Sequence, residues 1–349
     1  MNDMKEENPF TLTFGKPPAS FITRYEDTNT IINSFSGNNP ISQTYLIEGI
    51  RGSGKTVFMT SIANELKKTG DWVVADLLPQ RDLLDESANR LSDIVRSHKQ
   101  WIPSGMSLSL GGTKLEWNDR SLAQDNISIM ESLLNALVKR KKKVLFTIDE
   151  VSSGQNMRDF GNEFQILVRK EYPVFLIMTG LYEDIHSVQN DKSLTFLLRS
   201  PKIRLSGLSG FQITNQYESL LHLSPESAKE LSELTKGYAF AFQLLGMLFF
   251  EKKASETLED ILPKLDEMLD DFAYRKIWES LSETDQRVVR IIPDEGIKTK
   301  EACELLSMTS SVFSKYQERL KKKGIMKSST YGRVELTLPR FSKIVQRYP

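Results

Sequence analysis

The residues best suited to chemistry form one short glycine-rich stretch at positions 49–56. The stretch reads Gly-Ile-Arg-Gly-Ser-Gly-Lys-Thr, which fits the spacing G-x-x-x-x-G-K-[ST]. Glycines at this spacing let the backbone curl so that successive N–H groups point inward, toward a bound anion. We therefore predict a loop that holds the phosphates of a nucleotide, with Lys55 on the β- and γ-phosphates and Thr56 on Mg²⁺.

A pair of carboxylates follows an apolar run later in the chain. Residues 144–148 are five apolar or β-branched residues in a row, and Asp149 and Glu150 come directly after them. Such a run is expected of a strand buried on both faces of a parallel sheet. Downstream of a phosphate loop, the arrangement is typical of the Walker B motif of ATPases. We expect Asp149 to hold Mg²⁺ through water and Glu150 to orient or deprotonate the water that attacks ATP.

Two more polar residues lie near the ends of later predicted strands. Thr179 follows the apolar residues 174–178, where its hydroxyl could reach the γ-phosphate or the lytic water, but Thr179-Gly180 could equally begin a turn. Arg199 precedes a short predicted strand at 202–205. It could act as an arginine finger across a subunit boundary, which would require self-association, or it could be an ordinary surface arginine.

The elements that must position these residues alternate between strand and helix. Strands are predicted at 43–48, 72–78, 144–148, 174–178 and 202–205, helices at 25–35, 55–68, 83–96 and 127–138, and a hairpin at 107–117 around Gly111-Gly112. This alternation predicts a doubly wound α/β fold with a parallel sheet and a ligand at the carboxyl ends of its strands. From residue 211 to residue 271 the pattern is only helical.

These motifs, in this order, resemble the AAA+ superfamily over residues 14–246, in particular archaeal and bacterial predicted ATPases related to origin-recognition-type initiators and to STAND signalling ATPases. The likeness is carried by Phe14-Gly15, by Phe-Ile-Thr-Arg-Tyr-Glu at 21–26, by the glycine-rich loop, by Ile-Asp-Glu-Val at 148–151, by Met-Thr-Gly-Leu at 178–181 and by Leu-Ser-Gly-Leu-Ser at 205–209. It implies ATP as the nucleotide, with Ile22 and Arg24 as contacts to the adenine. The expected nucleotide contacts are Ile22, Arg24, Gly49, Arg51, Gly52, Ser53, Gly54, Lys55, Thr56 and Val57.

The resemblance also implies that the helical segment 211–271 is a lid over the nucleotide. Initiator-type members place a sensor arginine at the start of a lid helix, and STAND-type members often carry Gly-x-Pro there. In this chain residues 236–243 read Lys-Gly-Tyr-Ala-Phe-Ala-Phe-Gln, with neither the arginine nor the proline. A slow nucleotide-gated signalling or scaffold switch is therefore an alternative to a fast motor, and Lys236 is a candidate substitute for the arginine.

The C-terminal segment predicts a winged helix-turn-helix. Helical patterns at 282–292, 298–306 and 310–323 precede an alternating stretch at 325–338 around Tyr331-Gly332. Residues 311–349 contain two acidic residues, Glu318 and Glu335, against ten basic ones: Lys315, Arg319, Lys321, Lys322, Lys323, Lys327, Arg333, Arg340, Lys343 and Arg347. A basic helix and wing favour contact with the phosphates of double-stranded DNA. The alternative is a module that binds protein.

Composition sets the remaining expectations. Basic and acidic residues balance at 46 each, so net charge favours neither a nucleic-acid nor a membrane partner. The polar, acidic N-terminus does not fit a secretory signal, and the most apolar stretch, 239–250, is shorter than the roughly 20 residues of a membrane span, so we expect a cytoplasmic protein. We predict a core at 1–206, whose first 45 residues approach the nucleotide from the adenine side, a helical lid at 207–272 and a winged helix at 273–349.

Overall fold

The computed structural model describes residues 7–13, 15, 17–37, 39–102, 106–108, 115–117, 126–329 and 332–349. The described chain forms two compact units. The first, here called the sheet unit, comprises residues 25–48 and 58–204. The second, the lid unit, comprises the N-terminal residues up to 24, the phosphate loop at 49–57 and everything from 205 onward.

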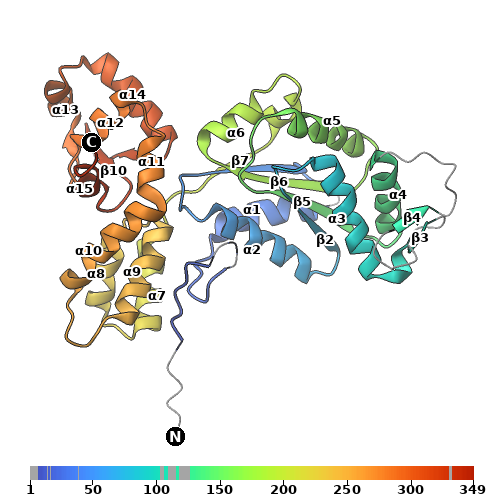
Figure 1. Ribbon diagram of the computed structural model, residues 1–349, viewed down its shortest axis with the longest axis horizontal. Helices are drawn as coiled ribbons and strands as arrows, with labels where there is room; N and C mark the ends of the chain where they lie inside the picture. The colour runs from blue at the N-terminus through green and yellow to red at the C-terminus, as the bar shows by residue number, and fades with distance from the viewer. Residues whose placement is uncertain are drawn as a thin grey trace, which may run out of the picture. The chain divides into compact units, whose positions relative to one another are not determined.

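A parallel sheet of five strands forms the centre of the sheet unit (Figure 1). The strand order is β2-β5-β6-β1-β7, and every neighbouring pair is parallel. The strands are β1 (Thr44–Glu48), β2 (Trp72–Leu77), β5 (Lys143–Ile148), β6 (Val174–Gly180) and β7 (Lys202–Arg204). All residues of β1 and β6 are buried, because these central strands are covered on both faces. The predicted α/β fold is confirmed.

Helices cover both faces of this sheet (Figure 1). On one face Phe35 packs against Phe175 and Tyr45, and on the other Phe160 meets Phe146 edge-on. The helices are α1 (Tyr25–Ser36), α3 (Leu83–Ser97), α4 (Asn126–Val138), α5 (Gln155–Arg169) and α6 (Tyr182–Gln189), with short turns η1 (Lys99–Trp101) and η2 (Thr195–Arg199). Helix α2 (Lys55–Lys68) begins in the phosphate loop and continues into the sheet unit. Helix α5 was not among the predicted helices.

A small antiparallel hairpin lies between α3 and α4 in the chain. Its strands, β3 (Met106–Leu108) and β4 (Leu115–Trp117), pair with Met106 opposite Trp117. The hairpin predicted at 107–117 is therefore confirmed, while its expected turn at Gly111-Gly112 lies outside the described residues.

From residue 205 onward, the lid unit continues with four helices that share one core with the segment beyond them. These are α7 (Gly210–Leu221), α8 (Pro225–Leu234), α9 (Ala239–Glu251) and α10 (Leu258–Leu269), followed by a π-helical turn η3 (Asp270–Tyr274) and α11 (Arg275–Glu279). The N-terminal segment packs into these helices, where the Phe10 ring lies on Gly246 of α9 and beside Tyr217 and Phe242. A Cβ at Gly246 would lie 2.4 Å from that ring, so glycine is required for the contact.

The last part of the lid unit, here called the C-terminal module (residues 283–349), combines helices with a small sheet. It contains α12 (Glu283–Arg290), α13 (Thr299–Leu306), α14 (Ser310–Lys322) and α15 (Phe341–Val345). Its antiparallel sheet has the order β8-β10-β9, with β8 (Ile297–Lys298), β9 (Met326–Ser328) and β10 (Arg333–Leu336). The three predicted helices and the hairpin are present, with β8 added as a third strand. Tyr331 of the predicted turn lies outside the described residues.

No helix in the described part of the chain combines the length and the apolar character that crossing a bilayer requires.

Candidate nucleotide site

The phosphate loop takes the conformation that its glycines permit. Gly52 and Gly54 have positive φ values of 77° and 89°, which side chains rarely tolerate. At Gly49 the limit is space, since a Cβ there would lie 2.5 Å from the Ser53 hydroxyl oxygen. The loop thus depends on three of its glycines for physical reasons, as a loop that curls around an anion requires.

Lysine 55 starts helix α2 and folds back over the loop. Its ammonium donates hydrogen bonds to the carbonyls of Gly49 and Ile50, each at 3.0 Å. The amide of Ser53 also donates to the Ile50 carbonyl, at 3.2 Å, which closes the curl. The Lys55 ammonium and the N-terminus of a 14-residue helix, which is its positive end, therefore both lie at the phosphate loop. This arrangement suits the binding of an anion.

The residues predicted to contact the base lie in the same unit as the loop. Arg24 donates a hydrogen bond to the carbonyl of Ser53 at 3.4 Å, and Ile22 is buried in the core formed with the lid helices. Of the other expected contacts, Arg51 is exposed, whereas Thr56 and Val57 in the first turn of α2 are partly buried. Phe14, which carries part of the resemblance, lies outside the described residues.

The lid residue Tyr238, which sequence reasoning did not single out as a site residue, touches the loop. Its hydroxyl donates to the carbonyl of Arg51 at 2.7 Å, and the amide of Phe240 donates to the carbonyl of Gly52 at 3.1 Å. The sequence did contain a signal that could have pointed to this residue, because Tyr238 stands at the x of the place where STAND-type members carry Gly-x-Pro. Lys236, the guessed substitute, instead pairs with Asp294.

In the sheet unit, Asp149, Glu150 and Thr179 form one hydrogen-bonded group. The Thr179 hydroxyl donates to Asp149 Oδ1, which also accepts from the amide of Glu150 at 3.1 Å. Glu150 has a left-handed backbone with φ of 52° and an exposed side chain. Thr179 is fully buried and belongs to strand β6, so the alternative that Thr179-Gly180 begins a turn is wrong. The group holds one carboxylate in place and leaves the other facing outward.

The register of the strands shows that β1 and β5 end at the same edge of the sheet. Glu48, the last residue of β1, pairs with Gly180, and Ile148, the last of β5, pairs with Met178. The chain therefore leaves β1 into the phosphate loop and leaves β5 into Asp149 at the same edge, with Thr179 on the strand between them. This is the carboxyl edge at which α/β sheets bind ligands.

Arg199 lies apart from that group. It is the last residue of η2 and is exposed, and its side chain makes no hydrogen bond or ion pair with another residue that the structure describes. Its neighbour Leu198 is also exposed, at 58%. Neither the arginine-finger role nor the surface alternative is tested by this placement.

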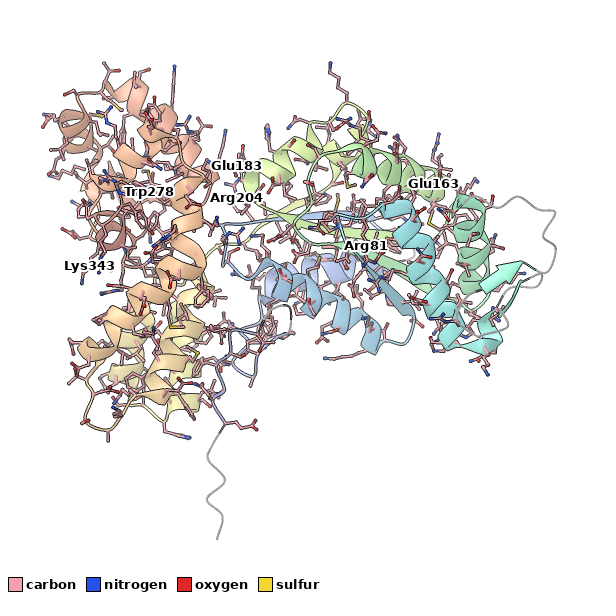
Figure 2. All side chains as sticks on the ribbon, viewed as in Figure 1. Arg81, Glu163, Glu183, Arg204, Trp278 and Lys343 are labelled. Atoms are coloured by element: carbon pink, nitrogen blue, oxygen red, sulfur yellow. The ribbon has the colours of Figure 1, made fainter. Side chains whose placement is uncertain are left out.

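An ion pair between a half-exposed arginine and a buried glutamate, which the sequence did not reveal, lies directly before the phosphate loop. Glu48 accepts from Arg204 at 2.6 Å across the β1–β7 pair, and Arg204, labelled in Figure 2, also lies over the ring of Tyr182. The Glu48 side chain is 4% exposed. Since Gly49 follows one partner and Leu205 the other, the pair fixes the two strand ends from which the chain enters the loop and the lid.

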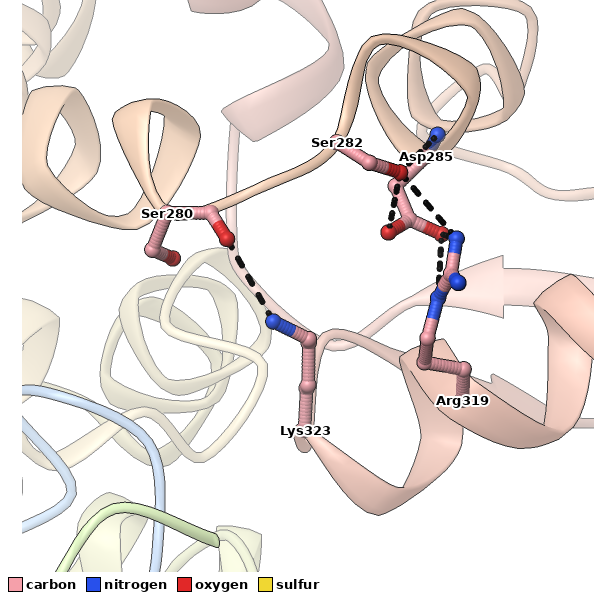
Figure 3. A network of polar contacts seen from close by, with 5 residues as sticks. All are labelled: Ser280, Ser282, Asp285, Arg319 and Lys323. Carbon is pink, nitrogen blue, oxygen red and sulfur yellow. Dashed lines mark hydrogen bonds and ion pairs between the residues drawn. The ribbon is translucent and has the colours of Figure 1, made fainter. Parts of the chain in front are cut away.

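Most of the cations counted in residues 311–349 have partners inside the lid unit. Figure 3 shows Arg319 of α14 bound to Asp285 and Ser282, with Lys323 donating to the carbonyl of Ser280. Arg340, Lys343 and Arg347 all face Asp266 of α10. Lys322 pairs with Glu318, Lys327 pairs with Glu335, and Arg333 donates to the carbonyls of Glu295 and Gly296. Within the described residues, only Lys315 and Lys321 of the ten make no hydrogen bond or ion pair through their side chains.

Comparison with solved structures identifies the fold. No protein-family model and no curated protein sequence matches the chain. The structure of the Aeropyrum pernix ORC2 protein in ADPNP-ADP complexes is similar, with 14% identity, 98% of this chain and 97% of that chain covered, and a TM-score of 0.59. Cdc6p from Pyrobaculum aerophilum covers 93% of each chain at 12% identity, with a TM-score of 0.49. At such identity the first likeness establishes the fold alone, which is that of the ORC2 protein.

Proposed function

We propose that this chain, which has the fold of an AAA+ ATPase, binds and hydrolyses ATP and that its nucleotide state controls the C-terminal module. The observation that carries the proposal is the conformation of the phosphate loop. Three of its glycines lie where a side chain would clash or strain the backbone, and the ammonium of Lys55 donates to a carbonyl of the same loop. A solved structure with the same fold is a complex with ADPNP and ADP, which supports a nucleotide at this loop.

The donor set fits Mg-ATP. The Thr56 hydroxyl and the Asp149 carboxylate are the hard oxygen donors that Mg²⁺ prefers, and bound Mg²⁺ would neutralise charge on the phosphates. Glu150 would orient or deprotonate the attacking water, because its carboxylate is exposed while its amide is anchored to Asp149. Thr179 would position Asp149 through its hydroxyl. Arg199, on an exposed turn, would serve a neighbouring copy if the protein self-associates.

Turnover measurements test this assignment. We expect Glu150→Gln to lower ATP turnover by about 100-fold or more while ATP still binds, as removal of a general base does. Lys55→Ala should lose binding itself. Glu171→Gln and Lys67→Ala are matched controls, because Glu171 is also an exposed glutamate with positive φ and Lys67 lies in the last turn of the same helix. Wild-type protein that binds no ATP would refute the proposal, and binding without turnover would refute the enzyme in favour of a nucleotide-gated switch.

For the C-terminal module we propose double-stranded DNA as the first candidate partner, through a winged helix whose α14 would face the groove. The unpaired cations that support it are Lys315 and Lys321. A second candidate, a protein partner, is favoured by a specific observation: eight of the ten cations counted in the sequence already have partners within the lid unit. Such cations are less available to phosphates than the sequence count implied.

A further inference from the structure

The contacts of Tyr238 orient the phosphate loop. The hydroxyl of Tyr238 and the amide of Phe240 donate hydrogen bonds to two successive loop carbonyls, those of Arg51 and Gly52. In a trans peptide the C=O and the following N–H point in opposite directions. Holding the Arg51 carbonyl toward the lid therefore turns the Gly52 N–H away from the lid, toward the side on which a curled loop presents its amides to an anion.

Space as well as hydrogen bonding links Tyr238 to this loop. A Cβ at Gly52 would lie 2.1 Å from the Tyr238 hydroxyl oxygen and 3.1 Å from Cβ of Phe240. The loop backbone thus lies directly against the tyrosine, so a movement of Gly52 toward the ring must displace the ring.

Tyr238 also contacts a second buried tyrosine. Its ring lies 6.1 Å from the ring of Tyr274 at the end of η3. Tyr274 in turn donates to the carbonyl of Pro339 at 2.8 Å and packs edge-on against Phe341 of α15, with ring centroids 4.8 Å apart. Burial raises the pKa of both tyrosines well above the usual range, so both hydroxyls remain protonated donors at physiological pH.

The C-terminal module approaches the loop at one further point. Gly324, in the turn after α14, lies against Ile50, since a Cβ at this glycine would be 3.6 Å from Cβ of Ile50. The carbonyl of Gly324 also accepts from the hydroxyl of Thr337, two residues before Pro339. The segment around Pro339 is therefore joined to the loop through Tyr274 and Tyr238 on one path and through Gly324 on another.

We propose that Tyr238 is a positioning residue for the phosphate loop and that the Tyr238–Tyr274 pair couples the loop to the C-terminal module. The inference rests on the proposed function in one respect, namely that a nucleotide is what changes the loop.

Three tyrosine variants test the coupling in the full chain. Tyr238→Phe and Tyr274→Phe each remove one hydroxyl of the pair. Tyr217→Phe is the matched control, because Tyr217 is also fully buried in the lid unit and donates one hydrogen bond to a main-chain carbonyl, that of Phe242, at 2.9 Å. Affinity is measured by titration with a fluorescent ATP analogue and Mg²⁺. Amide hydrogen exchange of residues 339–345 is measured with and without ATPγS and Mg²⁺.

We expect the nucleotide to change exchange at 339–345 by at least threefold in wild type and in Tyr217→Phe, and by less than half that factor in Tyr238→Phe and Tyr274→Phe. We also expect Tyr238→Phe alone to weaken nucleotide affinity, by about 3- to 10-fold, the effect of one net hydrogen bond. A response at 339–345 that is the same in all three variants would overturn the coupling. Unchanged affinity in Tyr238→Phe would overturn the positioning role.

Exchange in nucleotide-free protein separates this inference from the proposed function. Without nucleotide, Tyr238→Phe should raise amide exchange at 339–345 at least twofold relative to Tyr217→Phe. The reason is that Tyr274, which contacts Tyr238, also contacts Pro339 and Phe341 of that segment. If wild type binds no nucleotide but this increase is seen, the coupling stands and the proposed function fails. If nucleotide binds normally and the increase is absent, the proposed function stands and the coupling fails.

Discussion

Arg340 and Asp266 form a two-pronged ion pair that joins the residue preceding α15 to helix α10. Arg340 Nε donates to Oδ1 of the carboxylate and a terminal nitrogen donates to Oδ2 at 2.8 Å. The Asp266 side chain is 1% exposed, and Lys343, labelled in Figure 2, and Arg347 lie 3.9 and 3.7 Å from the same carboxylate. Three cations from the end of the chain therefore share one buried carboxylate.

Asp266→Asn should destabilise the lid unit strongly. Removing one partner of a buried pair leaves the other charge uncompensated, which costs about 3–5 kcal/mol in unfolding free energy. The measurement is urea unfolding followed by circular dichroism. The neighbouring Glu267→Gln is the control, because Glu267 forms an exposed pair with Lys264 and should change stability by about 0.5 kcal/mol or less. Equal unfolding midpoints for the two variants would contradict the role assigned to Asp266.

The ion pairs also show which part of the molecule local sequence could not predict. Counting charges in residues 311–349 gave a net excess of eight, yet Arg319 binds Asp285, 34 residues away, and Arg340 binds Asp266, 74 residues away. Glu48 and Arg204 are 156 residues apart. Such pairs depend on tertiary contacts, so a local count overestimates the charge available to a partner.

Elements with a strong periodic pattern were predicted well. The strands and the helix around the phosphate loop lie within two residues of their predicted bounds, because fully apolar runs and a glycine-rich turn specify them locally. Helix α5 was missed, and it carries Gly161 in its middle, which weakens a helical signal. The glycine has a packing reason, since a Cβ there would lie 2.3 Å from the side chain of Leu194.

Thr179→Val should slow ATP hydrolysis without preventing ATP binding. The variant removes the hydroxyl that donates to Asp149 and weakens the group that anchors Glu150. Misplacement of a catalytic group by about 1 Å costs roughly 100-fold, so a fall in turnover of about 10- to 100-fold is expected. Single-turnover hydrolysis and nucleotide affinity are measured on the same samples. Thr179→Ser keeps the hydroxyl and should retain most of the activity. Equal turnover in Thr179→Ser and Thr179→Val would show that the hydrogen bond from Thr179 to Asp149 does not contribute to hydrolysis.

Gly52→Ala should abolish most nucleotide binding, whereas Gly70→Ala should not affect it. The two glycines have nearly the same φ, 77° and 78°, so alanine strains the backbone equally, by about 1–2 kcal/mol. Only Gly52 has the Tyr238 hydroxyl 2.1 Å from the added Cβ, while at Gly70 nothing lies within 4 Å. We expect at least a tenfold loss of ATP affinity in Gly52→Ala, a shift of about 1.4 kcal/mol or more. Equal affinities in the two variants would show that contact with the lid does not shape the loop.

The salt dependence of DNA binding should be weak if the ion pairs of the C-terminal module persist. The logarithm of the binding constant falls with the logarithm of salt concentration by about 0.9 for each phosphate contacted. Lys315 and Lys321 alone predict a slope of about −2, whereas all ten cations would predict about −9. Fluorescence anisotropy with duplex DNA across a salt series measures this slope.

Charge reversal completes the test of that partner. Lys315→Glu with Lys321→Glu should remove the binding, and the matched reversal of Lys264, which lies on α10 and pairs with Glu267, should leave it unchanged. A slope near −9 would mean that the module releases its internal pairs on DNA. Binding that is absent in wild type would eliminate DNA and leave a protein as the partner of the module. Binding that the reversal of Lys315 and Lys321 leaves unaltered would show that these two lysines do not carry it.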